Sequence, residues 1–434
     1  MSEVASEVTP LRREIGRLGV AAIAMNGVIG SGIFALPAFA VAQLGAFSPW
    51  AFTICAMLIL TVALTFARLA SFFETTGGPI VYTTTAFGSY IGFQTGLLIY
   101  VSRVAAIAAS ANLIVDHAAA VWHLLSDGPV RAVAVITYIA FATALNAVGV
   151  RVGMIAILAI SALKLAPLFL LIAFGIPEID WAGTVAAEVP KLGQLGETTL
   201  VLMYAFIGFE FSLINAGETR DARSNIPRAL VGTVVAVAIC YILIQLVVVS
   251  VAPDIGSSET PLVEIASRLM GPTGAILLSL GVVFSVGGGT MTSLLTAPRL
   301  TYALAQERSL PSALAHVNPT TGAPVWSILL CGGLSIALAV GNQFVWLATI
   351  STFVRLVTYL MCIAALPVVE KKLGGSAGRF PLIGGFSVPL IAATLTAWLL
   401  VQSSLSAITI ALLIVLTGSP IYILCRRRSK TSKG

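Results

Sequence analysis

Three glycines, Gly27, Gly30 and Gly32, lie within six positions in the middle of the first apolar segment, which covers residues 18–42. Each glycine weakens a helix by about 1 kcal/mol relative to alanine, so the run favours a break in winding at membrane depth. The broken ends would carry free N–H groups on one side and free C=O groups on the other. Such ends suit a zwitterion such as an amino acid, whose carboxylate faces the N–H groups and whose ammonium faces the C=O groups. The alternative is a small-residue face that lets two helices pack closely.

A second apolar segment has the same kind of interruption near its middle. Within residues 204–212, Gly208 and the carboxylate of Glu210 separate aromatic and aliphatic side chains. The interruptions lie in the first and sixth apolar segments, so a repeat of five spans would have opposite membrane orientations in its two copies. Paired broken helices at matching positions of inverted halves indicate the binding site of a transporter. The two halves share no obvious residue-level repeat, so this prediction depends on position alone.

Charged side chains inside apolar segments are the next candidates, because a charge at the bilayer centre costs about 3 kcal/mol or more. Lys164 is expected either to carry a proton during transport or to be a fixed cation bonded to carbonyls of the first span. Glu210 is expected to tie spans one and six together, to relay a proton, or to meet a cationic substrate. Arg103 and Arg355 are expected to pair with Glu210 or a carbonyl, to extend toward the cytoplasm, or to act in substrate binding or gating.

The eighth apolar segment holds a run of three glycines at 287–289, with hydroxyl side chains on both sides. Close helix packing is one explanation of this run. The other is a pocket widened beside Gly289, in which Ser285, Thr290 or Ser293 offers an oxygen to a cation or to the substrate.

The composition identifies an integral membrane protein. The 434 residues are 58% hydrophobic and 10% charged, whereas soluble domains carry about a quarter charged residues. The five cysteines have no CxxC spacing and the three histidines have no metal-like spacing, so neither a metal site nor a disulfide framework is expected. The sequence has no nucleophile-and-base motif, no HExxH motif and no phosphate-binding glycine loop. An enzyme, a cofactor and direct use of ATP are therefore not expected.

Crossing the hydrocarbon as a helix takes about 20 apolar residues, and twelve such spans are predicted. They cover residues 18–42, 48–73, 90–118, 130–148, 152–176, 196–216, 227–252, 272–303, 325–341, 344–369, 383–402 and 405–425. Together they form one transmembrane domain over 18–425, in which 18–176 and 196–369 are the two repeats. The remainder, 383–425, holds two additional helices that offer a packing or dimer surface.

The basic residues give the expected orientation. With twelve spans and a cytoplasmic amino terminus, 17 of the 24 Lys and Arg fall on one side of the membrane and three on the other, while four lie within spans. The positive-inside rule therefore assigns the loose tail over 1–17 and the basic tail over 426–434 to the cytoplasm, with the protein in the cytoplasmic (inner) membrane. The same asymmetry explains the formal charge of +6 without nucleic-acid binding. No cleavable signal peptide is expected.

Residues 30–34 (Gly-Ser-Gly-Ile-Phe) and 206–210 (Phe-Ile-Gly-Phe-Glu), with twelve spans around them, resemble the amino acid–polyamine–organocation family. The basic connection over 218–228, which ends in Asn-Ile-Pro-Arg, is similar to the connection after the sixth span in this family. The resemblance covers nearly the whole chain and does not identify the substrate. It implies the fold shared with the leucine transporter: an all-α membrane protein with two inverted five-helix repeats, broken helices one and six, and two further helices.

For the site, the resemblance implies that the substrate carboxylate meets the N–H groups and hydroxyl around Ser31, and that the ammonium meets nearby carbonyls. Tyr204 falls where related arginine exchangers have an aromatic gate. Gly289 falls where those exchangers have a tryptophan, which argues against an arginine-type pocket or for a bulkier substrate. Lys164 falls where some members carry a lysine in place of a sodium ion. The expected substrate-binding residues are Val28, Gly30, Ser31, Gly32, Ile33, Tyr204, Phe206, Ile207, Gly208 and Gly289.

The sequence thus predicts a secondary transporter that moves amino acids or related amines by alternating access. Proton symport is expected, and exchange of one substrate for another is the alternative. A channel or receptor with a transporter fold is a second class, and an intramembrane enzyme is a third. The expected partners are the substrate, a coupling proton and the lipid bilayer, and a homo-oligomer remains open.

Overall fold

The computed structural model describes residues 15–120, 122–126, 128–148, 154–214, 216–319, 321–382 and 384–431, without the side chains of 154–162, 376 and 428–431. In these ranges the chain is helical and has no strand; an isolated parallel bridge joins Ile15 to Thr219. Most of the predicted amino-terminal tail, and the basic residues Arg12, Arg13, Arg151 and Lys433 of the orientation argument, lie outside the described residues.

The α-helices are α1 (Arg17–Val28), α2 (Gly32–Leu44), α3 (Ser48–Ala70), α4 (Pro79–Phe87), α5 (Ser89–Ala119), α6 (Gly128–Ala147), α7 (Met154–Gly175), α8 (Trp181–Val185), α9 (Leu192–Leu202), α10 (Phe211–Ile214), α11 (Ala222–Val251), α12 (Pro261–Gln306), α13 (Val325–Ala339), α14 (Phe344–Leu373), α15 (Ser387–Val401) and α16 (Leu405–Thr431). The 3-10 helices are η1 (Gly45–Phe47), η2 (His123–Ser126), η3 (Ile176–Glu178), η4 (Met203–Phe206), η5 (Ala216–Glu218), η6 (Ile255–Ser257), η7 (Ser312–Ala315) and η8 (Gly375–Ala377).

In the described part of the chain, seven helical segments are long and apolar enough to cross a membrane. They are Gly32–Ala70, Ser89–Ala119, Gly128–Ala147, Ala222–Val251, Pro261–Gln306, Phe344–Leu373 and Leu405–Arg427. The remaining predicted spans fall on α7, on the short helices α13 and α15, and on the interrupted segment from α9 to α10. Helices satisfy every internal backbone group within one segment, which is what hydrocarbon requires of a spanning chain. The chain is therefore a helical membrane protein.

Two helix boundaries differ from the sequence prediction. The predicted connection before the third span instead leads into a separate helix, α4, which ends at Gly88 with φ 90°. The eighth span was expected from residue 272, but α12 begins at Pro261 and bends at Gly271, where φ is 67°. Proline fits the first turn of a helix, and glycine adopts a positive φ without strain, so each helix starts at a proline and turns at a glycine. These cues were present in the sequence, but hydropathy alone does not reveal them.

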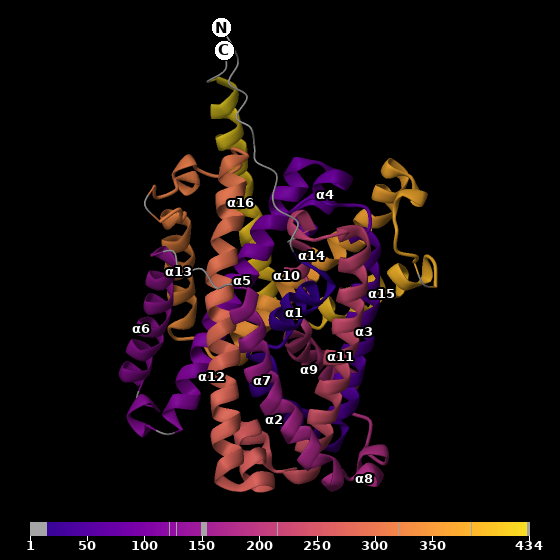
Figure 1. Cartoon of the computed structure of the whole chain (residues 1–434), viewed down its shortest axis with the longest axis vertical. Coiled ribbons are helices and arrows are strands. Elements are labelled where there is room, and N and C mark those ends of the chain that lie inside the picture. The colour runs from indigo at the N-terminus through magenta and orange to yellow at the C-terminus, as the bar shows by residue number, and fades with distance from the viewer. Residues whose placement is uncertain are drawn as a thin grey trace.

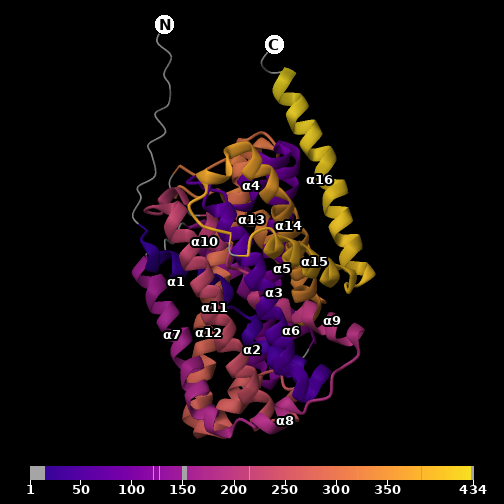
Figure 2. The same ribbon diagram turned by 90° about the vertical axis from the view of Figure 1, so that its right-hand side faces the viewer.

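A single large cluster of buried apolar side chains extends from Val20 in α1 to Leu399 in α15. Around it, α3 packs along α11, and α5 packs along both α12 and α14. Helix α16 lies on the outside of the bundle, where it stands apart from the other helices in Figure 2, and it exposes Leu412 and Leu416. Apolar side chains exposed in a row on one helix suit a lipid-facing position or a subunit contact.

The two ends of the molecule carry different connections. Both views place α4 near one end and α8 near the opposite end, and α16 extends beyond the bundle at the end of α4 (Figures 1 and 2). The connections that hold α4 and α8 are the ones predicted on opposite sides of the membrane. At the α4 end, Arg68 of α3 forms an ion pair with Glu370 of α14 at 2.7 Å and donates to the carbonyl of Phe380 at 2.9 Å, which joins α3 to the connection before α15.

Candidate functional site

The first apolar segment is interrupted between α1 and α2, where residues 29–31 are not helical. At the end of α1, the carbonyl of Val28 accepts from the Tyr241 hydroxyl at 3.3 Å, and the carbonyl of Ile29 accepts from Ser285 Oγ at 3.2 Å. At the start of α2, the N–H groups of Gly32 and the following residue belong to the first helical turn, whose donors have no acceptor within the helix. One interruption therefore offers acceptors and donors a few ångströms apart.

The sixth predicted span is interrupted as well. Helix α9 tightens into η4, the chain becomes extended at Ile207, and Gly208 takes φ 125° before α10 begins at Phe211. Only glycine adopts such a φ readily, so this residue determines where the chain leaves the helix.

The two interruptions touch through their backbones. A Cβ atom added at Gly27 would collide with the carbonyl of Gly208, and one added at Gly208 would collide with the carbonyl of Gly27. A Cβ atom added at Gly32 would lie 2.7 Å from Cα of Ala205. These glycines therefore have both of the roles considered from the sequence. They accompany the breaks in helical winding, and they allow two segments of the backbone to approach each other closely.

A cavity of about 580 Å³ lies between the interruptions. It is bounded by residues of α1, α2, α5, α10, α12 and α14 and by the segment from Tyr204 to Gly208. It continues to Ile15, Glu218 and Arg299, which belong to or adjoin connections predicted on the cytoplasmic side. The cavity thus reaches from the two broken helices toward one end of the molecule.

Tyr204 links three elements beside the cavity. Its hydroxyl lies 3.0 Å from Ser31 Oγ, and Ser110 Oγ of α5 donates to the same serine oxygen at 3.2 Å. The ring of Tyr204 makes an edge-on contact with Phe344, the first residue of α14, at 5.6 Å between centroids. Tyr204, which falls where related arginine exchangers have an aromatic gate, therefore contacts both the break in the first helix and the start of α14.

Lys164 lies behind the first interruption and does not line the cavity. Its side chain is buried, and Nζ donates to the carbonyl of Ile29 at 2.7 Å and to that of Asn26 at 3.3 Å. Among the described residues it forms no ion pair with a carboxylate. The lysine thus holds the end of α1 through main-chain oxygens alone, the contact expected of a structural cation and equally open to a proton carrier.

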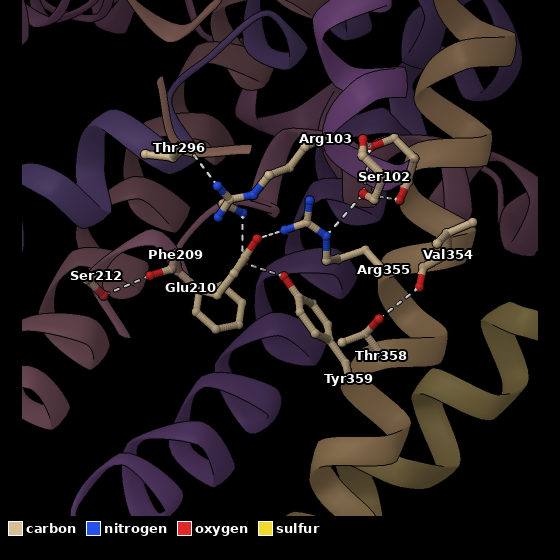
Figure 3. A network of polar contacts seen from close by, with 12 residues as sticks. Ser102, Arg103, Phe209, Glu210, Ser212, Thr296, Val354, Arg355, Thr358 and Tyr359 are labelled. Atoms are coloured by element: carbon tan, nitrogen blue, oxygen red, sulfur yellow. Dashed lines mark hydrogen bonds and ion pairs between the residues drawn. The ribbon is translucent and has the colours of Figure 1, made fainter. Parts of the chain in front are cut away.

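Glu210 and Arg355 form a buried ion pair (Figure 3). The other carboxylate oxygen of Glu210 accepts from the Tyr359 hydroxyl at 2.8 Å and from the N–H of Gly208 at 3.2 Å. Arg355 Nε donates to Ser102 Oγ at 3.0 Å. This network connects the segment before α10 to α14 and α5. The sequence predicted that Glu210 ties span six to span one, but among the described residues its contacts are to α14 and to its own segment, and none is to α1 or α2. Breaking a buried pair by removing one partner costs about 3–5 kcal/mol, so the network fixes the second interruption in place.

Arg103 is the second arginine of the cavity wall and has a different environment. Nη1 donates to Thr296 Oγ1 of α12 at 2.7 Å, and the guanidinium carbon lies 4.0 Å from the centroid of the Phe211 ring. Its Nε and Nη2 atoms are buried and have no hydrogen-bond partner among the described residues. The predicted pairing with Glu210 is made by Arg355 and not by Arg103.

Most of the predicted substrate-binding residues line the cavity, and two do not. Phe206 lies outside it, with its ring packed on Tyr241 at 5.2 Å and on Phe52 at 6.2 Å between centroids, and Ile33 is fully buried elsewhere. The predicted residues that line the cavity are Val28, Gly30, Ser31, Gly32, Arg103, Tyr204, Ile207, Gly208, Gly289 and Arg355. A Cβ atom added at Gly289 would meet no atom within 4 Å, so this glycine leaves open space.

Several site residues were not singled out from the sequence. Ser110 and Ser351 are cavity-lining serines within apolar helices, Thr296 holds Arg103, and Tyr241 holds the end of α1. A lone hydroxyl in an apolar span is a weak signal, because such groups often bond the carbonyl four residues earlier in their own helix. Ser285, one of the oxygens proposed from the sequence, bonds the carbonyl of Ile29.

Comparison with known proteins also indicates an amino acid permease. The sequence model of a family described as amino acid permease matches residues 15–424. The chain is 26% identical to the serine/threonine exchanger of Bacillus subtilis (strain 168) over 444 residues, covering 98% of this chain and 99% of the relative. It is 29% identical to an uncharacterized transporter of Mycobacterium bovis, covering 92% of this chain and 88% of the relative. Because the family match covers nearly the whole chain, this protein belongs to the amino acid permeases of the amino acid–polyamine–organocation family.

Proposed function

We propose that this protein is a secondary transporter of amino acids that works by alternating access in the cytoplasmic membrane. Its proposed architecture has twelve spans, with two inverted repeats of five followed by α15 and α16. The first repeat comprises α1–α2, α3, α5, α6 and α7, and the second comprises α9–α10, α11, α12, α13 and α14. The observation that carries this function is the cavity, because both helix interruptions line it.

The helix contacts support the inverted repeat. If the repeats are equivalent, exchanging them turns the contact of α5 with α14 into a contact of α12 with α7, and both contacts are extensive. The same exchange turns the contact of α1 with α11 into one of α9 with α3, which is also present. The contacts α3–α11, α5–α12 and α6–α13 each map onto themselves, as contacts on a pseudo-two-fold axis do.

The unexpected short helix α4 fits the same relation. It starts at Pro79, directly after the second span, and turns at Gly88 into α5. The first part of α12 starts at Pro261, soon after the seventh span, and turns at Gly271. Each repeat therefore has a proline-started short helix, ended by a positive-φ glycine, in the same place. No matching run of residues is needed for this agreement.

For substrate binding, we propose that the carboxylate faces the first-turn N–H groups of α2 and the Ser31 hydroxyl. The ammonium faces main-chain carbonyls at the ends of α1 and η4, near Val28, Tyr204 and Ile207. These carbonyls and N–H groups carry opposite partial charges, and both interruptions contribute to one cavity. Both termini are proposed to be cytoplasmic, so the cavity continues toward the cytoplasm at Glu218.

For coupling, we propose proton symport with Lys164 as the proton carrier. A charged ammonium has three N–H donors, whereas the neutral amine keeps two, and Lys164 has two carbonyl acceptors. Losing the proton therefore breaks neither bond to α1, and both protonation states are accommodated. Exchange is the second candidate, since one relative is named a serine/threonine exchanger.

The function is tested with purified protein reconstituted in liposomes. Uptake of radiolabelled serine, glutamate, leucine and arginine is measured with and without an inwardly directed proton gradient, and in vesicles preloaded with each amino acid. We expect saturable uptake of at least one of them, together with counterflow, which a carrier gives and a pore does not. Protein-free liposomes are the control. The absence of saturable uptake and exchange for every amino acid and amine in a full panel contradicts the proposal.

A further inference from the structure

The charges around the cavity do not balance in its deep part. Arg103 and Arg355 both line it, and Glu210, which is not among the lining residues, is the carboxylate that lies against Arg355. Glu210 forms its ion pair with Arg355. Within the described residues, no carboxylate forms an ion pair with Arg103, and Figure 3 shows both guanidinium groups directed toward the region of Glu210. One positive charge in the cavity wall therefore lacks a partner.

Arg103 is buried but incompletely bonded. Its exposed fraction is 2%, and of its three guanidinium nitrogens only Nη1 donates a hydrogen bond to a described residue, Thr296. The ring of Phe211 covers one face of the group, and the buried edge that carries Nε and Nη2 makes no hydrogen bond to a described residue. Arginine cannot lose its proton in a protein, and its two nitrogens on one edge match the two oxygens of a carboxylate. Cations at membrane depth normally pair or mark a substrate path.

The position of Arg103 separates it from the site proposed for the substrate backbone. Ser110, which donates to Ser31 at the first interruption, lies seven residues later on α5. Seven residues are nearly two full turns, so both side chains leave the same face of α5, about 10 Å apart along its axis. Arg103 therefore enters the wall of the same cavity about two helical turns along α5 from the serine that contacts the first interruption.

We propose that Arg103 binds the side-chain carboxylate of the substrate, so that the transported amino acid is acidic and has a side chain of at least the length of glutamate. This inference rests on the proposed function, because it names the substrate class of the same cavity. The ligand supplies the missing anion: its main carboxylate faces α2, and its second carboxylate pairs with Nε and Nη2 of Arg103. Hydroxyl groups at Thr292 and Ser293, on the same wall as Thr296, remain beside the bound side chain.

The first test uses the unmodified protein in liposomes. Uptake of radiolabelled glutamate is measured against unlabelled glutamate, glutamine, serine and arginine. We expect saturable glutamate uptake that glutamate inhibits at least about tenfold more strongly than glutamine does, because glutamine leaves the arginine edge half bonded. Saturable serine or leucine uptake that glutamate does not inhibit overturns the inference while the proposed function stands. Failure of every amino acid to enter or exchange overturns the function itself.

The second test uses Arg103→Gln. We expect the KM for glutamate to rise at least about tenfold and the preference to reverse toward glutamine, whose amide pairs with the new amide. Arg103→Lys, which keeps the charge but loses the two-pronged edge, is expected to fall between the two. Arg268→Gln is the matched control, because this exposed arginine pairs with Glu264 at 2.8 Å and does not line the cavity; it is expected to leave both KM values within about twofold.

Retained glutamine uptake and a single symmetric peak on size exclusion show that the Arg103→Gln protein is folded. If neither arginine variant folds, the competition experiment on the unmodified protein decides the substrate class alone. A small coupling anion is the competing occupant of the arginine edge. Neutral amino acid uptake that requires chloride, and that loses this requirement in Arg103→Gln, contradicts a substrate carboxylate at Arg103.

Discussion

At the scale of single residues, the buried charges of this permease lie in three different environments, although burying each of them costs free energy. Arg355 is neutralised by Glu210, Lys164 is held by main-chain carbonyls, and Arg103 is left with a free edge. The sequence identified all four as exceptional, because charges at membrane depth are expensive. It did not predict which arginine pairs with Glu210, because spacing along one helix does not determine the register of its neighbour.

Lys164 gives the clearest prediction at this scale. We expect Lys164→Ala to abolish the stimulation of uptake by an acidic exterior, since the variant has no amine to carry a proton, while exchange between preloaded substrate and external label continues. The measurement is initial uptake rate in liposomes at several external pH values and a fixed internal pH. Lys372→Ala is the control, because Lys372 also donates to two main-chain carbonyls, those of Thr85 and Ala86, at an exposed helix end.

Retained exchange shows that the Lys164→Ala protein is folded and binds its substrate. If its rate has the same pH dependence as that of the unmodified protein, the lysine is a structural cation and the proton travels by another group. Complete loss of exchange together with uptake also contradicts the proposed carrier role, since a carrier is required only for the proton-driven step.

At the scale of secondary-structure elements, the site depends on two helices that stop inside the bundle. Glycine content and the matching positions of the two segments predicted where the interruptions lie, because each glycine acts locally on its own backbone. The sequence led us to expect the two interruptions to lie together, but the backbone approach of Gly27 to Gly208 is a tertiary property that spacing along one segment does not give. Phe206 illustrates the limit: it belongs to the second interrupted segment but turns its ring away from the cavity onto Tyr241.

The close contact between the two interrupted segments can be tested by adding one methyl group. We expect Gly32→Ala to lower the uptake rate at least about tenfold, because the new Cβ atom would lie 2.7 Å from Cα of Ala205 and must push η4 away from α2. Gly232→Ala is the control, since this glycine of α11 has open space where a Cβ atom would go, and alanine stabilises an exposed helix by up to about 1 kcal/mol.

Both variants are purified in detergent, and their thermal unfolding is measured beside uptake. Gly32→Ala is expected to unfold at a lower temperature, and Gly232→Ala at the same or a higher temperature. Normal uptake by Gly32→Ala means that the two segments do not pack at this distance during transport, and that their close contact is not required for function.

At the scale of the whole molecule, the cavity extends from the interruptions toward one end of the molecule. Ile15, Glu218 and Arg299 mark that end, and Tyr204, at the interruptions, contacts both Ser31 and the first residue of α14. In the proposed orientation the structure therefore corresponds to an inward-facing state. Hydropathy predicted a helical membrane protein, and the orientation drawn from the basic residues stays a prediction, but the choice among conformations depends on small energy differences that no local pattern encodes.

This conformation predicts one-sided access to water. In a background with the partly exposed Cys425 replaced by serine, Thr292→Cys is expected to react with a membrane-impermeant maleimide in inside-out vesicles and to react at least about tenfold more slowly in intact cells. A transported amino acid should slow the inside reaction. Lys191→Cys, in the exposed connection beside α8, is the control and should react from the outside. Equal labelling of Thr292→Cys from both sides contradicts a carrier that opens one side at a time.

The pairing of Ile15 with the segment after α10 has a mechanical consequence. Its N–H donates to the carbonyl of Glu218 at 3.0 Å, and its carbonyl accepts from the N–H of Arg220 at 2.9 Å. These two hydrogen bonds join the residue just before α1, the first half of the first broken helix, to the segment just after α10, the last part of the second. A force applied at Ile15 is therefore transmitted to the segments that adjoin both helix interruptions, at the end of the molecule toward which the cavity extends.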